Sequence, residues 1–166
     1  MQTLRDRHPN FAGMKVSDAP SAQVAPYLAI GLDVFVGAEG VLPEGLAAEA
    51  AAAVSGVAAE AAAAVPGVAA GAAGAVSGVA AAFPEAVAAL VREPTPARAQ
   101  LVQTLRELLS RRRFQASVKT ALGLRGLPVG PDVRAPLQPL RARDVRELHD
   151  ALGRLPEVAP LLAPAL

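Results

Sequence analysis

Two short apolar runs, at residues 11–16 and 32–37, constrain the fold of this chain most. Each run is bounded by polar or turn residues, a pattern typical of buried strands. Helices are expected over residues 1–8, 21–30 and 42–53, because apolar positions recur there at helical spacing or strong helix formers dominate. The alternation of strands and helices therefore favours a parallel α/β sheet or a barrel.

An eleven-residue, alanine-rich unit occurs three times over residues 47–79. Each copy contains a Ser-Gly or Pro-Gly step that breaks a helix, so we expect helix ends leading into short strands rather than a long supercoil. The first copy is predicted to lengthen the helix that precedes it. Pro66 makes the middle copy the poorest strand, because proline cannot donate a ladder hydrogen bond. The third copy, with Val76 and Ser77, runs directly into the next expected helix and is predicted to pair beside residues 32–37.

Composition excludes several classes of protein. The net charge is +1, aromatic residues make up 3% of the chain, and there is no Trp or Cys. We therefore predict no nucleic-acid partner, no metal site and no cofactor. The polar start of the chain lacks a secretory signal, which predicts a cytoplasmic protein. The uncharged stretch at residues 61–84 raises the alternative of a membrane span, but alanine and glycine give little transfer energy and Pro66-Gly67 interrupts it, so no membrane is expected.

The C-terminal half is predicted to be helical, with an extended, proline-rich connector at residues 127–139. The expected helices cover residues 85–92, 97–112, 114–124 and 144–155. Three consecutive arginines, Arg111 to Arg113, lie at one helix end. They suggest either a phosphate-binding patch or, more simply, a solvated helix terminus.

Lys15 ends the first apolar run and is the candidate catalytic residue. An amine held at an apolar strand end loses hydration and becomes nucleophilic, so it can form a Schiff base with a carbonyl substrate. The alternative is an ordinary lysine whose ammonium group lies in solvent.

Several segments, taken together, resemble the dihydrodipicolinate synthase and N-acetylneuraminate lyase family. They are residues 11–17, 36–39, 74–80, 126–131 and 133–137, in the family's order. The resemblance implies a partial (β/α)8 (TIM) barrel over residues 1–92, covering about the last three strands and carrying the repeat. Residues 93–166 would form the C-terminal helical extension.

The resemblance also implies roles for individual residues. Lys15 would be the Schiff-base nucleophile for pyruvate or a related 2-oxo acid. Ser17, Gly37 and Glu39 would line the substrate pocket, and Val76 and Ser77 would contribute backbone groups near the lysine.

Some features of the family are missing. A complete barrel needs about 250 residues, and this chain starts near the sixth strand. It lacks the Gly-Thr-Thr-Gly type loop and the proton-shuttling tyrosine, for which Tyr27 is no substitute because it falls on an expected helix. Ala81 and Gly40 replace an asparagine and a glutamate found in relatives. The additional repeat copies look like a tandem duplication.

We therefore expect the C-terminal part of a Schiff-base-forming lyase or synthase that is inactive alone. It should form a homo-oligomer or associate with a missing N-terminal half, because a half-barrel exposes sheet edges and an apolar face. The alternative is a non-catalytic structural or interaction protein in which the alanine-rich repeat is the functional part.

Overall fold

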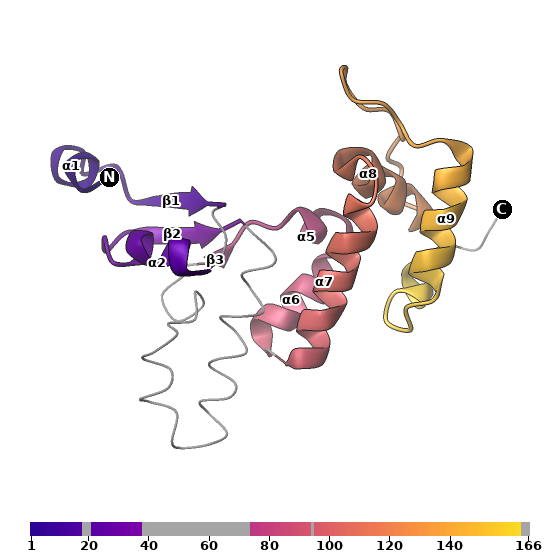
Figure 1. The fold of residues 1–166 in the computed structure, drawn as a ribbon, viewed down its shortest axis with the longest axis horizontal. Helices are drawn as coiled ribbons and strands as arrows, with labels where there is room; N and C mark the ends of the chain where they lie inside the picture. Colours follow the sequence, from indigo (N-terminus) through magenta and orange to yellow (C-terminus); the bar gives the residue numbers. More distant parts are fainter. Residues whose placement is uncertain (18–20, 38–73, 94, 164–166) are drawn as a thin grey trace.

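The computed structural model describes residues 1–17, 21–37, 74–93 and 95–163. Within these ranges the protein is mixed α/β and rich in helix, with a small parallel sheet followed by a group of packed helices (Figure 1). The helix predicted over residues 42–53, the first two repeat copies and Glu39 lie outside the described residues.

The N-terminal part is a three-stranded parallel sheet in the order β1-β2-β3. Its elements are α1 (Gln2–Arg7), β1 (Gly13–Val16), α2 (Ser21–Leu28), β2 (Asp33–Val36) and β3 (Gly74–Ala75). The predicted strands and helices are confirmed here, and the third repeat copy supplies β3, as predicted. It pairs through Gly74 and Ala75, opposite Phe35 and Val36, rather than through Val76 and Ser77.

Helix α2 covers only one face of this sheet. Val16, Val24 and Val34 form a small buried core, against which Met14, Tyr27 and Leu28 pack. Because side chains alternate between the two faces of a strand, Lys15 and Phe35 project from the opposite face. Both are exposed, Phe35 at 39%. Among the described residues, β1 is therefore covered on one side, whereas the sequence pattern predicts a buried strand.

The C-terminal part is built from packed helices. They are α5 (Gly78–Ala82), α6 (Pro84–Arg92), α7 (Pro96–Ser110), α8 (Phe114–Leu124), α9 (Ala142–Gly153) and the short 3-10 helix η2 (Ala159–Leu161). All of the predicted C-terminal helices are present, within a few residues of their expected ends. Helix α5 was not predicted, because a single helical turn in an alanine-rich repeat has little sequence signal.

Local capping interactions explain where these helices begin and end. The side-chain oxygens of Ser77 and Thr95 accept the backbone N–H groups of Ala80 and Arg98, at 3.2 Å and 3.3 Å. Helix α8 ends at Leu124, and Gly126 shortly after it has a φ of 78° that is accessible to glycine at little cost. The N–H groups of Gly126 and Leu127 then bond back to the carbonyls of Gly123 and Leu122, a Schellman motif.

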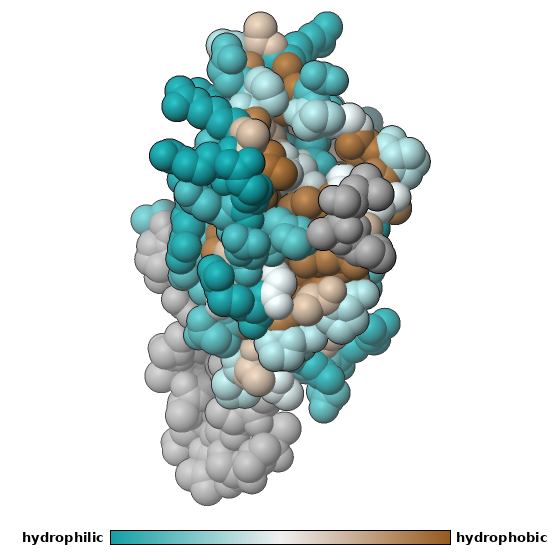
Figure 2. Space-filling view, turned by 90° about the vertical axis from the view of Figure 1, so that its right-hand side faces the viewer, coloured by the Kyte–Doolittle hydropathy of each residue, from teal (hydrophilic) through white to brown (hydrophobic). Residues whose placement is uncertain are grey.

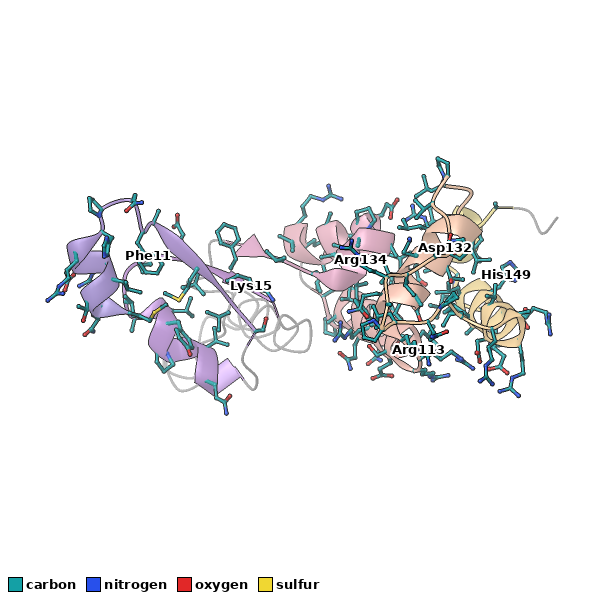
Figure 3. All side chains as sticks on the ribbon, turned by 90° about the horizontal axis from the view of Figure 1, so that it is seen from above. Phe11, Lys15, Arg113, Asp132, Arg134 and His149 are labelled. Atoms are coloured by element: carbon teal, nitrogen blue, oxygen red, sulfur yellow. The ribbon has the colours of Figure 1, made fainter. Side chains whose placement is uncertain are left out.

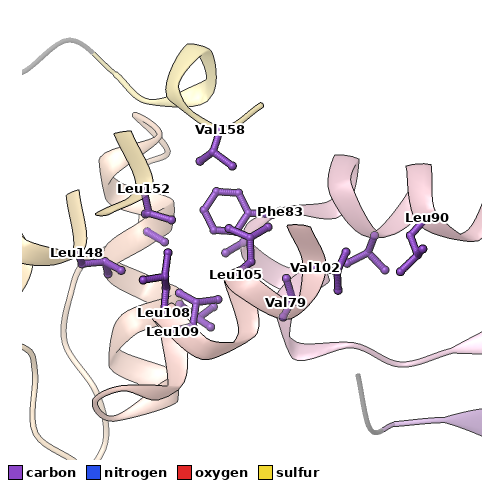
Figure 4. Packing of buried hydrophobic residues seen from close by; sticks show 14 of the residues in the cluster. Val79, Phe83, Leu90, Val102, Leu105, Leu108, Leu109, Leu148, Leu152 and Val158 are labelled. Carbon is purple, nitrogen blue, oxygen red and sulfur yellow. The ribbon is translucent and has the colours of Figure 1, made fainter. Parts of the chain in front are cut away.

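A single hydrophobic core unites these helices. Phe83 lies at its centre with no exposed surface, close to Leu105, Leu152 and Val158 (Figure 4). Val79 and Leu90 belong to the same core, so α5 and α6 pack with the C-terminal helices rather than on the sheet. Seen from the side of α9, the surface is mostly hydrophilic, with apolar atoms between the charged side chains (Figure 2).

Two half-buried arginines connect the helices. Arg112 Nε donates to Asp144 Oδ1 at 2.7 Å and the same guanidinium bonds Glu147, which joins the end of α7 to α9. The hydrogen bond from Arg112 lowers the pKa of Asp144. Arg125 binds Glu85 and the carbonyl of Ala82, and its guanidinium lies 5.5 Å from the Phe83 ring centroid. Arg112, a member of the arginine cluster, thus forms an interhelical ion pair.

Among the helices of the described ranges, none is both long and apolar enough to cross a membrane. The first part of the uncharged stretch considered above, up to residue 73, lies outside those ranges.

Candidate functional site

Lys15 lies at the C-terminal end of β1, one residue before the strand ends (Figure 3). Its neighbour in the sheet is Phe35 of β2, on the face that α2 does not cover. The side chain is exposed. The loss of hydration expected from the sequence is therefore not provided by the described residues.

Ser17 and Gly37 lie next to Lys15. Both follow the last paired residues, Val16 and Val36, and the N–H of Gly37 donates to the carbonyl of Val16 at 2.7 Å, so the ladder continues past the strand ends. Residues two apart on a strand share a face. Lys15, Ser17 and Gly37 consequently lie on the same side of the sheet.

The contacts among these three residues are direct. Lys15 Nζ donates a hydrogen bond to Ser17 Oγ. A Cβ atom added at Gly37 would overlap Cε and Nζ of Lys15 and would lie 2.9 Å from Ser17 Oγ. The side chain of Lys15 therefore crosses over the bare backbone of Gly37, toward the middle of the sheet.

Val76 and Ser77 follow β3 at the same edge of the sheet. Val76 is 53% exposed, and Ser77 caps α5 through its side chain. Extending the β2–β3 register by one residue sets Val76 opposite Gly37. The C-terminal ends of three adjacent parallel strands thus carry Lys15, Ser17, Gly37, Val76 and Ser77.

The arrangement offers an amine with an adjacent hydroxyl on a sheet face that no described helix covers. Tyr27 packs against the small core on the other face, so it cannot serve this amine. In the described ranges, no three histidine, cysteine or carboxylate side chains come together in a way that could hold a metal ion. Lys15 and Ser17 together present a primary amine in contact with a hydrogen-bonding hydroxyl.

Sequence reasoning assigned Ser17 to the substrate pocket and missed its contact with Lys15. The i, i+2 spacing on a strand was a usable signal, because it sets both side chains on one face. The position of the Lys15 side chain over Gly37 had no such signal, since it depends on the register between β1 and β2.

The sequence profile of the Dihydrodipicolinate synthetase family matches residues 32–155. This is about three quarters of the chain, and the chain belongs to that family. The match includes Gly37, Glu39, Val76 and Ser77 and begins after the strand that carries Lys15. No curated protein matches the chain.

Proposed function

We propose that this chain is part of a pyruvate-dependent aldolase or synthase and that Lys15 forms a Schiff base with a small 2-oxo acid. Family membership supports the aldolase or synthase type, with a small-molecule substrate. The observation that carries the proposal is the amine of Lys15 at the C-terminal edge of a parallel sheet, beside Ser17 and Gly37. Active sites of parallel α/β folds gather at this edge.

The proposed step begins with neutral Lys15 Nζ attacking C2 of pyruvate. A C–N bond forms, the carbonyl π electrons move to oxygen, and that oxygen takes up a proton. The carbinolamine then loses water to give a protonated imine, from which loss of a C3 proton gives the nucleophilic enamine. The described residues near Lys15 include a hydroxyl but no general base suited to the later steps, so we expect an adduct without turnover from this chain alone.

The proposed architecture is part of a (β/α)8 barrel. Three parallel strands with a helix on one face and Lys15 and Phe35 on the uncovered face support it, because parallel sheets are ordinarily covered on both faces. In a barrel the uncovered face would line the interior. Further strands of the barrel, or a second copy of this chain, would complete the site.

Borohydride trapping tests the function. The protein is incubated with pyruvate, reduced with borohydride, digested and analysed by mass spectrometry. The chain has two lysines, Lys15 and Lys119, so Lys119 is an internal control. We expect a reduced adduct on Lys15 and none on Lys119, and we expect Lys15→Ala to remove it without changing helical content.

Equal modification of Lys15 and Lys119 would contradict the proposal, because it would reflect nonspecific reductive alkylation. Absence of any adduct would favour the alternative, a non-catalytic structural or interaction protein. Adding pyruvate to the Lys15→Arg variant separates loss of the amine from loss of the positive charge.

A further inference from the structure

We propose that Ser17 and Gly37 are positioning residues for the Lys15 amine, Ser17 as a hydrogen-bond acceptor and Gly37 through its lack of a side chain. This proposal rests on the proposed function only in assuming that the positioned amine then forms a Schiff base. It assigns both residues an action on the lysine, in addition to any contact with substrate.

The register of β1 and β2 brings Ser17 and Gly37 opposite each other. Lys15 pairs with Phe35, and Val16 pairs with Val36, so Ser17 comes opposite Gly37. The hydrogen bond from the N–H of Gly37 to the carbonyl of Val16 keeps the two chains together at this point. Gly37 is thus directly across from Ser17 and diagonal to Lys15, within reach of a long side chain.

A side chain at position 37 would clash with Lys15. An alanine at position 37 would overlap Cε and Nζ of Lys15 where they now lie. The flexible end of the lysine side chain would have to shift away from its position over Gly37. Any side chain at position 37 therefore changes the path of Lys15, although the backbone of Gly37 has no conformational need for glycine.

The hydrogen bond between Lys15 and Ser17 restricts the lysine side chain. An exposed lysine side chain has several rotatable bonds, and holding it in one geometry costs about 2 kcal/mol of rotamer entropy. The hydroxyl of Ser17 fixes the direction of one N–H bond. Orientation of a nucleophile before attack raises its reaction rate, and small displacements can reduce that rate by as much as about a hundredfold.

The test compares the two lysines by competitive labelling. Full-length protein is treated with a trace of acetic anhydride, and the labelling of Lys15 relative to Lys119 is read by mass spectrometry for wild type, Ser17→Ala, Ser17→Thr and Gly37→Ala. We expect the ratio to rise severalfold in Ser17→Ala and Gly37→Ala, because the amine is released from the sheet. Ser17→Thr, which keeps the hydroxyl, should match the wild type.

Pyruvate trapping of the same variants gives the second readout. We expect the rate of adduct formation to fall about tenfold in Ser17→Ala although simple acylation rises, because orientation is lost while access improves. A merely structural role would move the two readouts in the same direction. Amide exchange of β1 and β2 checks folding, and the pair Ser17→Ala and Ser17→Thr carries the test if Gly37→Ala disturbs the sheet.

The outcomes separate the two proposals. An unchanged labelling ratio in Ser17→Ala would overturn the positioning role, whether or not pyruvate reacts. A changed ratio together with no pyruvate adduct on wild-type Lys15 would support positioning and overturn the proposed function.

Discussion

The sheet and the helices of this protein differ in the size of their hydrophobic cores. The helical part has an extensive core centred on Phe83, and arginine ion pairs connect its elements. Among the described residues, the sheet and α2 share a core of three buried valines, and the other face of the sheet carries exposed Lys15 and Phe35. No residue in the described part of the chain belongs to both cores. Among the described residues, the part that carries the candidate chemistry has the smaller hydrophobic core, in keeping with the lower local stability common at ligand-binding regions.

The largest expected effect is the loss of stability when the core of the helical part is disrupted. Phe83→Ala removes a fully buried ring from the centre of the helical core and leaves a cavity, at a cost of about 3–5 kcal/mol. Denaturant unfolding followed by circular dichroism measures it. Val91→Ala is the matched control, because Val91 is 52% exposed and its truncation should change stability by less than about 0.5 kcal/mol. Equal effects of the two substitutions would contradict the assigned core.

A second substitution tests the independence of the sheet. Val34→Ala removes two methyl groups from its small core, worth about 2 kcal/mol. We expect the amides of β1 and β2 to exchange faster with solvent, while those of α7 and α8 keep their protection. Equal loss of protection in both parts would show that the sheet and the helices unfold as one cooperative unit.

The local structure could be predicted from sequence where it depends on nearby residues. The strands around Lys15 and Val34, and the helices from Pro84 onward, follow from apolar spacing and from capping residues such as Thr95. The proline makes the middle repeat copy the poorest strand, and the third copy is predicted for β3 because it leads directly into the next helix.

What could not be predicted depends on residues distant in sequence. The pairing of Arg112 with Asp144 joins positions 32 apart, and no local pattern specifies it. Whether Lys15 is desolvated depends on what covers its face of the sheet, which the strand itself does not determine. The contact between Lys15 and Gly37 depends on strand register, because a shift of one residue would send Gly37 to the other face.

A smaller loss of stability is expected from a substitution at Ser77, between β3 and the helices. Ser77→Ala removes the acceptor for the Ala80 N–H at the start of α5, a loss of about 1 kcal/mol. We expect faster amide exchange at Ala80, with little change in β1 or in α9. Ser77→Asp should retain the cap, and a similar loss in that variant would show that the hydroxyl of Ser77 acts through another contact.

The smallest expected effect comes from breaking the ion pair between Arg112 and Asp144. Among the described residues, ion pairs that join two elements occur in the helical part and not in the sheet, so this substitution also tests how the two parts differ. Asp144→Asn should lower the melting temperature at neutral pH by a few degrees or less, because the pair is partly exposed and screened by salt. Asp150→Asn is the control, since Asp150 lies 3.6 Å from His149 in a looser pair.

The pH dependence gives this prediction its sign. The hydrogen bond from Arg112 holds the pKa of Asp144 below the value of about 3.9 that the carboxyl has in an unfolded chain. The stabilisation is therefore complete above that unfolded value and is lost as pH falls through the lower folded value. The stability difference between wild type and Asp144→Asn should accordingly be largest near neutral pH and shrink in strong acid. A difference that stays constant down to pH 2 would mean that the substitution acts through packing of α9 and that the charge of Asp144 contributes nothing.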